Sequence, residues 1–346
     1  MKKQQIESQK GEIEFRKKLY QQQIDKNNLF EDEFDANGIE NILNSRMAKT
    51  RDQMVKLLKN EMTLTPYIEI GAERCQRSLV MENDLGLNGA AVDLSFDMLK
   101  SCDYYKKIFN KVKTPIRICC DANNLPFLSN SIPFAFCYET LHHFPEPTPI
   151  TKEIYRVLSP GGFFFFDEEP YKQILHFDLY KGQKIYSKDS LNKNKIKKII
   201  DHFFCSKICN EIEHGIIENH DLSLKAWKMS LQHFEENDVT FSSSNFFRSK
   251  LFNPTSKIKY FAGYLLGGSI SGICRKSGHM NRIYESIYDT IICPSCREDR
   301  AEILLEKNEA FFMCQQCSKK YPVVDEVLFL FTDKKFSELY PEYSII

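Results

Sequence analysis

The chain has 346 residues, of which 42% are hydrophobic and 13% aromatic, as in globular proteins and unlike disordered ones. Its 47 basic residues balance its 47 acidic ones, so overall charge gives no reason to expect a nucleic acid or a membrane surface as partner.

Residues 1–14 are polar and lack the apolar segment of a signal peptide. The longest weakly polar run, Phe261 to Cys274, is too short and too rich in glycine for a membrane span. We therefore expect a cytoplasmic protein without a membrane span. In that compartment the twelve cysteines are expected to be reduced thiols or metal ligands.

Residues 1–62 are rich in Gln, Glu, Lys and Asn, and their apolar residues recur at helical spacing. The recurring residues are Ile39, Ile42, Leu43, Met47, Met54, Leu57 and Leu58. The pattern predicts a lead-in of one or two helices before the first strand. These helices either pack on the core or form a lid over a site.

From Thr65 onward, apolar runs alternate with helical stretches. The strand candidates are Tyr67–Ile70, Ala90–Val92, Ile116–Cys120, Pro133–Tyr138 and Phe163–Phe166. The helical stretches are Arg77–Leu85, Phe96–Phe109 and Thr151–Leu158, and Pro160-Gly161-Gly162 predicts a turn. This alternation predicts an α/β fold with a doubly wound, mostly parallel sheet.

The first strand ends in Glu69-Ile70-Gly71, and the second ends at Asp93 about 20 residues later. Ligands of doubly wound sheets bind outside the carboxyl ends of the strands, where an acid after the second strand accepts from ribose hydroxyls. The spacing therefore fits an adenosine ligand.

Residues 171–285 are less periodic. Their apolar spacing predicts an amphipathic helix within Asp189–Ile212 and a late strand at Ile270–Arg275, and we expect them to complete the sheet and shape an acceptor pocket. Aromatic residues in this region fit an apolar or planar acceptor and a plain core equally well: Phe203, Phe204, Trp227, Phe234, Phe241, Phe246 and Phe247.

Two Cys-x-x-Cys sequences lie near the C-terminus, Cys293–Cys296 and Cys314–Cys317. Two such turns can present four thiolates to one tetrahedral Zn²⁺. Four cysteine ligands leave no open position, so this zinc is expected to be structural. We predict a separate zinc-ribbon domain over residues 290–335.

The segment from Phe311 to Cys317, with Tyr321-Pro322-Val323-Val324-Asp325, resembles the small zinc-ribbon family that activates RNA and protein methyltransferases. That resemblance implies a protein partner at the ribbon. The family usually follows the Tyr-Pro-Val turn with Asp-Gly-Ile-Pro, whereas this chain has Asp325-Glu326-Val327-Leu328.

The central region is similar to class I S-adenosylmethionine-dependent methyltransferases. Four motifs occur in the family's order: Asp93–Leu99, Asp121–Phe127, Phe134–Phe144 and Glu153–Gly162. The resemblance implies a methyltransferase domain over residues 63–285, with the cofactor half at 65–170 and the acceptor half at 171–285.

The resemblance also implies roles for single residues. Backbone N–H groups after Gly71, at Ala72 and Glu73, would approach the methionine portion of the cofactor, and Glu69 would set this loop by hydrogen bonds. Asp93 would accept from the ribose hydroxyls, and Leu94 would border the adenine. Asp121 and Ala122 would bind the adenine edge, with Phe127 beside the ring, and Glu139 would contact the cofactor or the acceptor. Glu73 and Cys75 stand where the family has its second and third glycines.

We therefore predict a methyltransferase that uses S-adenosylmethionine and transfers its methyl group to a small molecule or to RNA. A catalytic base is needed only for some acceptors, and Glu139, His142 and His143 are the candidates; none is assigned. The alternatives are a catalytically silent adaptor that docks through its zinc ribbon and a scaffold within a larger methyltransferase complex.

Overall fold

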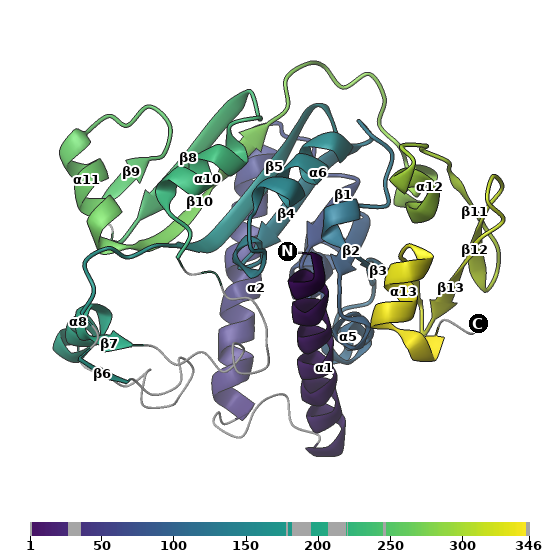
Figure 1. Ribbon diagram of the computed structural model, residues 1–346, viewed down its shortest axis with the longest axis horizontal. Coiled ribbons are helices and arrows are strands. Elements are labelled where there is room, and N and C mark those ends of the chain that lie inside the picture. Colours follow the sequence, from purple (N-terminus) through teal and green to yellow (C-terminus); the bar gives the residue numbers. More distant parts are fainter. Residues whose placement is uncertain are drawn as a thin grey trace.

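A single sheet of twelve strands runs through the protein in the order β11-β12-β13-β14-β3-β2-β1-β4-β5-β10-β8-β9 (Figure 1). The computed structural model describes residues 2–26, 36–177, 179–181, 195–206, 219, 221–244 and 247–343. The strands of this sheet are β1 (Tyr67–Ile70), β2 (Gly89–Asp93), β3 (Ile116–Cys120), β4 (Ile132–Tyr138), β5 (Leu158–Tyr171), β8 (Glu236–Ser242), β9 (Arg248–Lys250), β10 (Gly268–Arg275), β11 (Leu305–Lys307), β12 (Phe311–Cys314), β13 (Lys320–Val324) and β14 (Val327–Leu330).

The centre of the sheet is parallel, as predicted. The pairs β3–β2, β2–β1, β1–β4 and β4–β5 are all parallel. Because the chain moves outward in one direction from β1 to β3 and in the other from β4 to β5, the connections reverse between β1 and β4. The carboxyl ends of β1 and β4 therefore flank the place where doubly wound sheets bind ligands.

Beyond β5 the sheet becomes antiparallel, with β10 pairing to both β5 and β8, and β8 pairing to β9. The predicted late strand Ile270–Arg275 lies within β10, so this region does complete the sheet. Two short strands, β6 (Tyr180–Lys181) and β7 (Cys205–Ser206), form a separate pair. Of the helix predicted within Asp189–Ile212, the structure has Lys195–Phe204, while residues 189–194 and 207–212 lie outside the described part.

The C-terminal region joins the same sheet. β14 pairs in parallel with β3, and β11 to β13 continue outward as antiparallel strands. The zinc-ribbon segment was expected to be a separate module, yet its last strand is an integral neighbour of the central strands. The predicted boundaries at 62, 285, 290 and 335 stay predictions.

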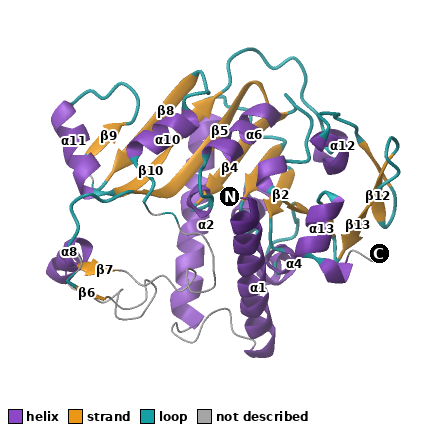
Figure 2. Cartoon of the chain, in the orientation of Figure 1, coloured by secondary structure: helices purple, strands orange, loops and turns teal. Residues whose placement is uncertain are grey.

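Helices cover both faces of the sheet (Figure 2). They are α1 (Lys2–Lys26), α2 (Ala36–Lys59), α3 (Gln76–Asp84), α4 (Phe96–Lys100), α5 (Cys102–Ile108), α6 (Thr148–Val157), α8 (Lys195–Phe204), α10 (Leu224–Leu231), α11 (Lys257–Leu266), α12 (Pro294–Glu298) and α13 (Asp333–Leu339). The lead-in consists of two helices, within the range predicted.

Alternate residues of each central strand pack into different hydrophobic cores on opposite faces of the sheet, as expected for a strand buried on both faces. Ile68 and Ile70 pack with residues of α6 and α10, whereas Tyr67 packs on the other face with Met54 and Leu57 of α2. Trp227, Phe234 and Phe241, which were weighed as acceptor contacts, are buried in the first of these cores. For these three aromatic residues the plain-core interpretation is therefore confirmed.

One local prediction needs correction and another can be refined. The turn expected at Pro160-Gly161-Gly162 does not interrupt the strand, because β5 runs through it with an irregularity in its register against β4. The helical stretch expected around Phe96–Phe109 consists of two helices, α4 and α5, separated at Ser101. Among the described helices, none is long and apolar enough to cross a membrane.

Candidate functional site

The turn after β1 is built from residues with left-handed backbone conformations. The φ angles of Gly71, Glu73 and Cys75 are 67°, 46° and 59°. Glycine adopts such angles readily, whereas other residues pay about 1–2 kcal/mol. Glu73 and Cys75 therefore reproduce the path of a glycine-rich turn without its glycines, and the chain tolerates the strain at both positions.

Gly71 itself leaves no room for a side chain. A Cβ atom built on Gly71 would lie 2.4 Å from Oγ1 and 2.5 Å from Cγ2 of Thr140. Thr140 follows β4, and its hydroxyl donates to the carbonyl oxygen of Tyr138 at 2.9 Å. The ends of β1 and β4 thus approach closely at the point where the connections of the sheet reverse.

The Glu73 side chain pairs with two arginines. Its Oε1 lies 2.7 Å from Nη1 of Arg74 and 3.0 Å from Nη1 of Arg16, which belongs to α1. Burial alone would raise the pKa of Glu73, but the neighbouring guanidinium groups lower it to about 2. Glu73 is therefore an anion that ties α1 to the turn after β1.

Asp93 ends β2 beside this turn. The backbone N–H of Glu73 donates to Oδ2 and that of Ser95 to Oδ1, both at 2.8 Å. Burial, reinforced by nearby Glu12, raises the pKa of Asp93 to about 6. Asp93 is not the N-cap of α4, because Ser95 takes that position and accepts from the backbone N–H of Met98.

Glu69 lies inside the protein, with an exposed fraction of 2%. Its carboxylate accepts from the backbone N–H of Ser78 at 3.0 Å and from the Ser78 hydroxyl, so it fixes the first turn of α3. Burial raises the pKa of Glu69 to about 7. Ala72 is buried as well, and its N–H donates to the carbonyl oxygen of Val92 at 3.1 Å.

The Asp121 carboxylate contacts residues from several segments of the chain. It accepts from the backbone N–H of Asn123 at 3.0 Å, in the short 3₁₀ helix Ala122–Asn124. It also contacts Lys335 of α13 and the amide nitrogen of Gln9 of α1, the latter at 3.5 Å. Sequence reasoning missed these two contacts, because the ends of the chain carry no motif that places them at the sheet.

Leu94 is partly buried in the core formed by α3, α4 and α13, and its carbonyl oxygen accepts from the Tyr340 hydroxyl at 2.6 Å. Phe127, expected beside the adenine ring, is instead fully buried in the core and pairs by a backbone bridge with Ile291. The expectation for Phe127 is therefore wrong, since its ring is enclosed by other side chains.

The loop after β4 is held by one buried carboxylate. Glu169 of β5 accepts from the backbone N–H groups of Thr140, Leu141 and His142 at 2.7, 2.9 and 3.2 Å. Its Oε2 also lies 2.9 Å from Nδ1 of His142. Sequence reasoning missed Glu169, although the acids directly after Phe166 could have indicated a polar cluster at this strand.

Glu139 precedes this loop with a φ angle of 48° and is partly exposed. Its carboxylate lies 3.5 Å from Nη2 of Arg46 of α2, and burial raises its pKa. The structure therefore brings the ends of β1, β2 and β4 together with side chains of both N-terminal helices.

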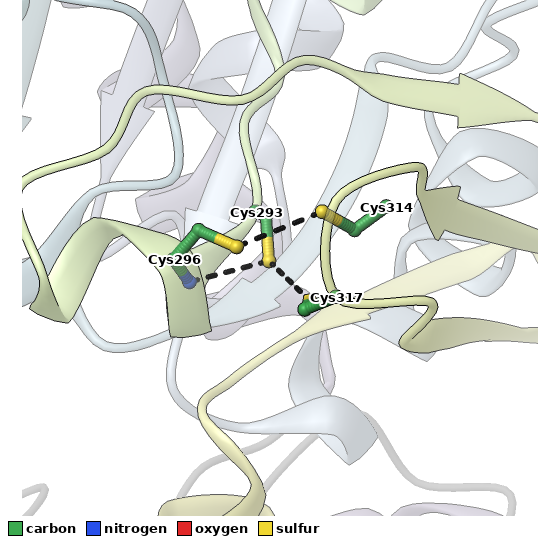
Figure 3. A group of neighbouring side chains, drawn as sticks. All are labelled: Cys293, Cys296, Cys314 and Cys317. Atoms are coloured by element: carbon green, nitrogen blue, oxygen red, sulfur yellow. Dashed lines mark hydrogen bonds between the residues drawn. The ribbon is translucent and has the colours of Figure 1, made fainter.

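The four ribbon cysteines converge on one point (Figure 3). Their sulfur atoms all lie within 4.8 Å of one another, with 3.6 Å between Cys293 and Cys317 and 3.7 Å between Cys296 and Cys314. A tetrahedral site with Zn–S bonds of about 2.3 Å places its sulfur atoms about 3.8 Å apart. The backbone N–H of Cys296 and the hydroxyl of Tyr321 contact Cys293 Sγ. The thiols therefore fit a closed tetrahedral metal centre.

Comparison with known proteins agrees with this geometry. Residues 68–166 match the family model described as a methyltransferase domain. An uncharacterized chloroplastic methyltransferase of Arabidopsis thaliana is 36% identical over 90 residues, which are 25% of this chain and 25% of that protein. The match thus spans about a quarter of the length of this curated relative.

Among solved structures, the chain is similar to one from a complex between the Haloferax volcanii Trm112 methyltransferase activator and a candidate methyltransferase. The identity is 15%, the TM-score 0.39, and the coverage 69% of this chain and 97% of the other. A second similar structure is phosphoethanolamine N-methyltransferase 2 of Haemonchus contortus in complex with S-adenosyl-L-methionine. Its identity to this chain is 16% and the TM-score is 0.36, and the match covers 66% of this chain and 53% of the other. By its strand order and the family match over residues 68–166, the chain has the class I methyltransferase fold.

Proposed function

We propose that the protein transfers the methyl group of S-adenosylmethionine to an acceptor. The methionine portion would lie at the turn Gly71–Glu73, the ribose at Asp93, and the adenine at Leu94, Asp121 and Ala122. Bound S-adenosylmethionine supplies an electrophilic methyl group on a sulfonium. The task of the chain is then to orient the cofactor and the acceptor for in-line displacement and to exclude water.

The observation that carries this proposal is the Asp93 carboxylate. Each oxygen accepts one backbone N–H, from Glu73 or from Ser95, and an ionised carboxylate offers about two acceptor positions per oxygen. Beyond these two bonds, each oxygen keeps one acceptor position, which would accept from a ribose hydroxyl. Two fixed amides also orient the carboxylate before any ligand arrives.

We expect the protein to bind S-adenosylmethionine in calorimetric titration, and Asp93→Ala to weaken binding by about 1–3 kcal/mol. Asp52→Ala is the matched control, since Asp52 is an aspartate of α2 whose side chain is 72% exposed. No heat from zinc-loaded wild-type protein at millimolar ligand would rule out the enzyme. Equal affinities of the wild type and Asp93→Ala would remove the ribose role from Asp93.

Cofactor affinity should also depend on pH through Asp93, whose pKa is about 6. Below that pH the carboxyl is protonated and loses acceptor capacity, so affinity at pH 5 should be about tenfold lower than at pH 7.5. Protonation of Asp93 does not cause this loss of affinity by unfolding the protein. A raised pKa means that the folded state binds the proton more tightly, so protonation of Asp93 below pH 6 favours folding.

Titrations at several pH values with Asp93→Asn provide the control. This variant should bind weakly at every pH, with a flatter profile than the wild type. Glu69 also has a raised pKa, of about 7. Any pH dependence of the affinity that remains in Asp93→Asn is therefore due to Glu69 or to other titrating groups. A wild-type profile parallel to that of Asp93→Asn would contradict the assignment.

The acceptor is a small molecule or RNA, and it would enter at the carboxyl ends of β4 and β5, with residues 171–285 shaping its pocket. If the acceptor needs a base, the His142 ring, held by Glu169 at 2.9 Å, is better oriented than Glu139, which is paired with Arg46. No catalytic residue is assigned.

We further propose that Cys293, Cys296, Cys314 and Cys317 hold a structural Zn²⁺ and that residues 290–335 form a fused zinc ribbon. The sulfur spacing supports the metal, and pairing of β14 with β3 supports a role as a built-in partner of the sheet. A further protein partner would have to use a ribbon surface other than the β14 edge, which β3 already occupies.

The second candidate is an adaptor that has lost catalysis. It is favoured by the two strained residues that replace glycines, Glu73 and Cys75, and by the ion pair between Glu73 and Arg16 at the turn. The titration with S-adenosylmethionine separates the two candidates, because an adaptor of this kind would bind no cofactor.

A further inference from the structure

Helix α1 crosses the ends of three parallel strands. It packs against α4 and α13, and Ile13 is buried in the core that includes Ala72, Leu79 and Phe96. Figure 1 shows α1 beside α13, below β2. One helix from the beginning of the chain thus covers the edge where the proposed cofactor would lie.

Three polar side chains of α1 face the three acids at this edge. Gln9 contacts Asp121 after β3, Glu12 lies close enough to Asp93 of β2 to raise its pKa, and Arg16 pairs with Glu73 after β1. These α1 positions are about 4.5 and 6 Å apart along the helix, and neighbouring strands are about 4.8 Å apart. The helix therefore aligns one polar side chain with each strand end.

Gln9 has an unused hydrogen-bonding group at this place. The residue is 8% exposed, and its side-chain amide nitrogen donates to Asp121 Oδ1 at 3.5 Å. Its amide oxygen is buried and has no hydrogen-bond partner among the described residues. A buried carbonyl without a donor costs about 1–3 kcal/mol, so such groups commonly mark a missing ligand or water.

The adenine amino group has the complementary chemistry. It carries two N–H donors, of which Asp121 would accept one in the proposed cofactor pose. The Gln9 oxygen, on the side chain that already touches Asp121, is an acceptor for the second. Hypoxanthine has a carbonyl oxygen at this position, so its exocyclic group would offer a donor to neither residue.

We propose that Gln9 is an adenine ligand and that α1 is the lid of the cofactor site. This inference rests on the proposed binding of S-adenosylmethionine. Arg16 and Glu73 would hold the lid against the turn after β1, while Gln9 closes it over the adenine. Binding would then order both ends of the site, and the side chain of Gln9 would select adenine over other bases.

The experiment titrates the full-length protein with S-adenosylhomocysteine and with S-inosylhomocysteine. The variants are Gln9→Ala and the similarly shaped Gln9→Met, and Gln22→Ala is the matched control because Gln22 is an exposed glutamine of the same helix. Thermal melts establish that each variant is folded. The readout is the affinity for each ligand and the ratio of the two affinities.

Loss of one hydrogen bond predicts that both Gln9 variants bind S-adenosylhomocysteine about 5–10-fold more weakly, with Gln22→Ala unchanged. Their preference over S-inosylhomocysteine should shrink by a similar factor. Unchanged affinity, or equal weakening for both ligands, would show that Gln9 does not read the base. Tighter binding would show that α1 blocks the site instead of closing it. If the wild type binds neither ligand, the proposed function itself fails, and the inference fails with it.

Discussion

The Gly71→Ala variant should be about 2–5 kcal/mol less stable than the wild type in urea unfolding and should bind S-adenosylmethionine weakly or not at all. Two costs add at this position. The φ angle of 67° is left-handed, which disfavours alanine by about 1–2 kcal/mol. The new Cβ would also lie 2.4 Å from Thr140 Oγ1, and overpacking of this kind costs about 1–3 kcal/mol.

Gly86→Ala separates these two costs. Gly86 has the same φ angle of 67°, but a Cβ there would have no neighbour within 4 Å. This variant should therefore lose only about 1–2 kcal/mol. Adding Thr140→Ala to Gly71→Ala should recover part of the lost stability. If the two glycine variants are equally stable, close contact between β1 and the loop after β4 does not constrain Gly71.

Cys314→Ser should abolish metal binding and unfold the ribbon locally. Wild-type protein should contain about one zinc per chain by elemental analysis and the variant close to none, because structural zinc needs all four ligands. Apparent zinc affinities of about 10–16 kcal/mol mean that such ribbons do not fold without metal. Hydrogen exchange should accelerate from Cys293 to Val324, across β11 to β13.

The acceleration of hydrogen exchange should not extend to β14. That strand pairs with β3, and Phe329 packs with Phe96, Phe336 and Tyr340, none of which depends on the metal. Cys274→Ser, at a buried cysteine of β10, is the control and should keep its zinc. Wild-type protein without zinc would exclude the metal site. Fast exchange that spreads into β14 and β3 would show that the ribbon and the sheet unfold together.

The parallel centre of the fold could be predicted because each strand from Tyr67 to Phe166 is a short apolar run between helical stretches. Burial on both faces makes such strands apolar along their whole length, so the sequence marks them clearly. The convergence of the four ribbon cysteines could also be predicted, because two Cys-x-x-Cys turns can bring four thiols to one tetrahedral site. The family motifs placed Asp93 and Asp121 at strand ends, and the structure has both there.

The remaining features depend on long-range contacts that leave no local pattern. Nothing near Gln9 or Lys335 in the sequence indicates that both side chains meet Asp121. The strand Val327–Leu330 is visible as an apolar run, but its pairing with β3 is decided by shape and hydrogen bonding between distant segments. Phe127 was misplaced for a related reason, since an aromatic residue within a binding motif can face either the ligand or the core.

The pairing of β14 with β3 has a consequence for synthesis of the chain. β3 ends at Cys120 and its outer neighbour begins only at Val327, so the ribosome needs roughly 10–40 s, at about 5–20 residues per second, to supply that neighbour. During this interval the backbone of β3 is an open edge, and open edges invite pairing with other chains. Nascent protein should therefore depend on chaperones until its last strand emerges.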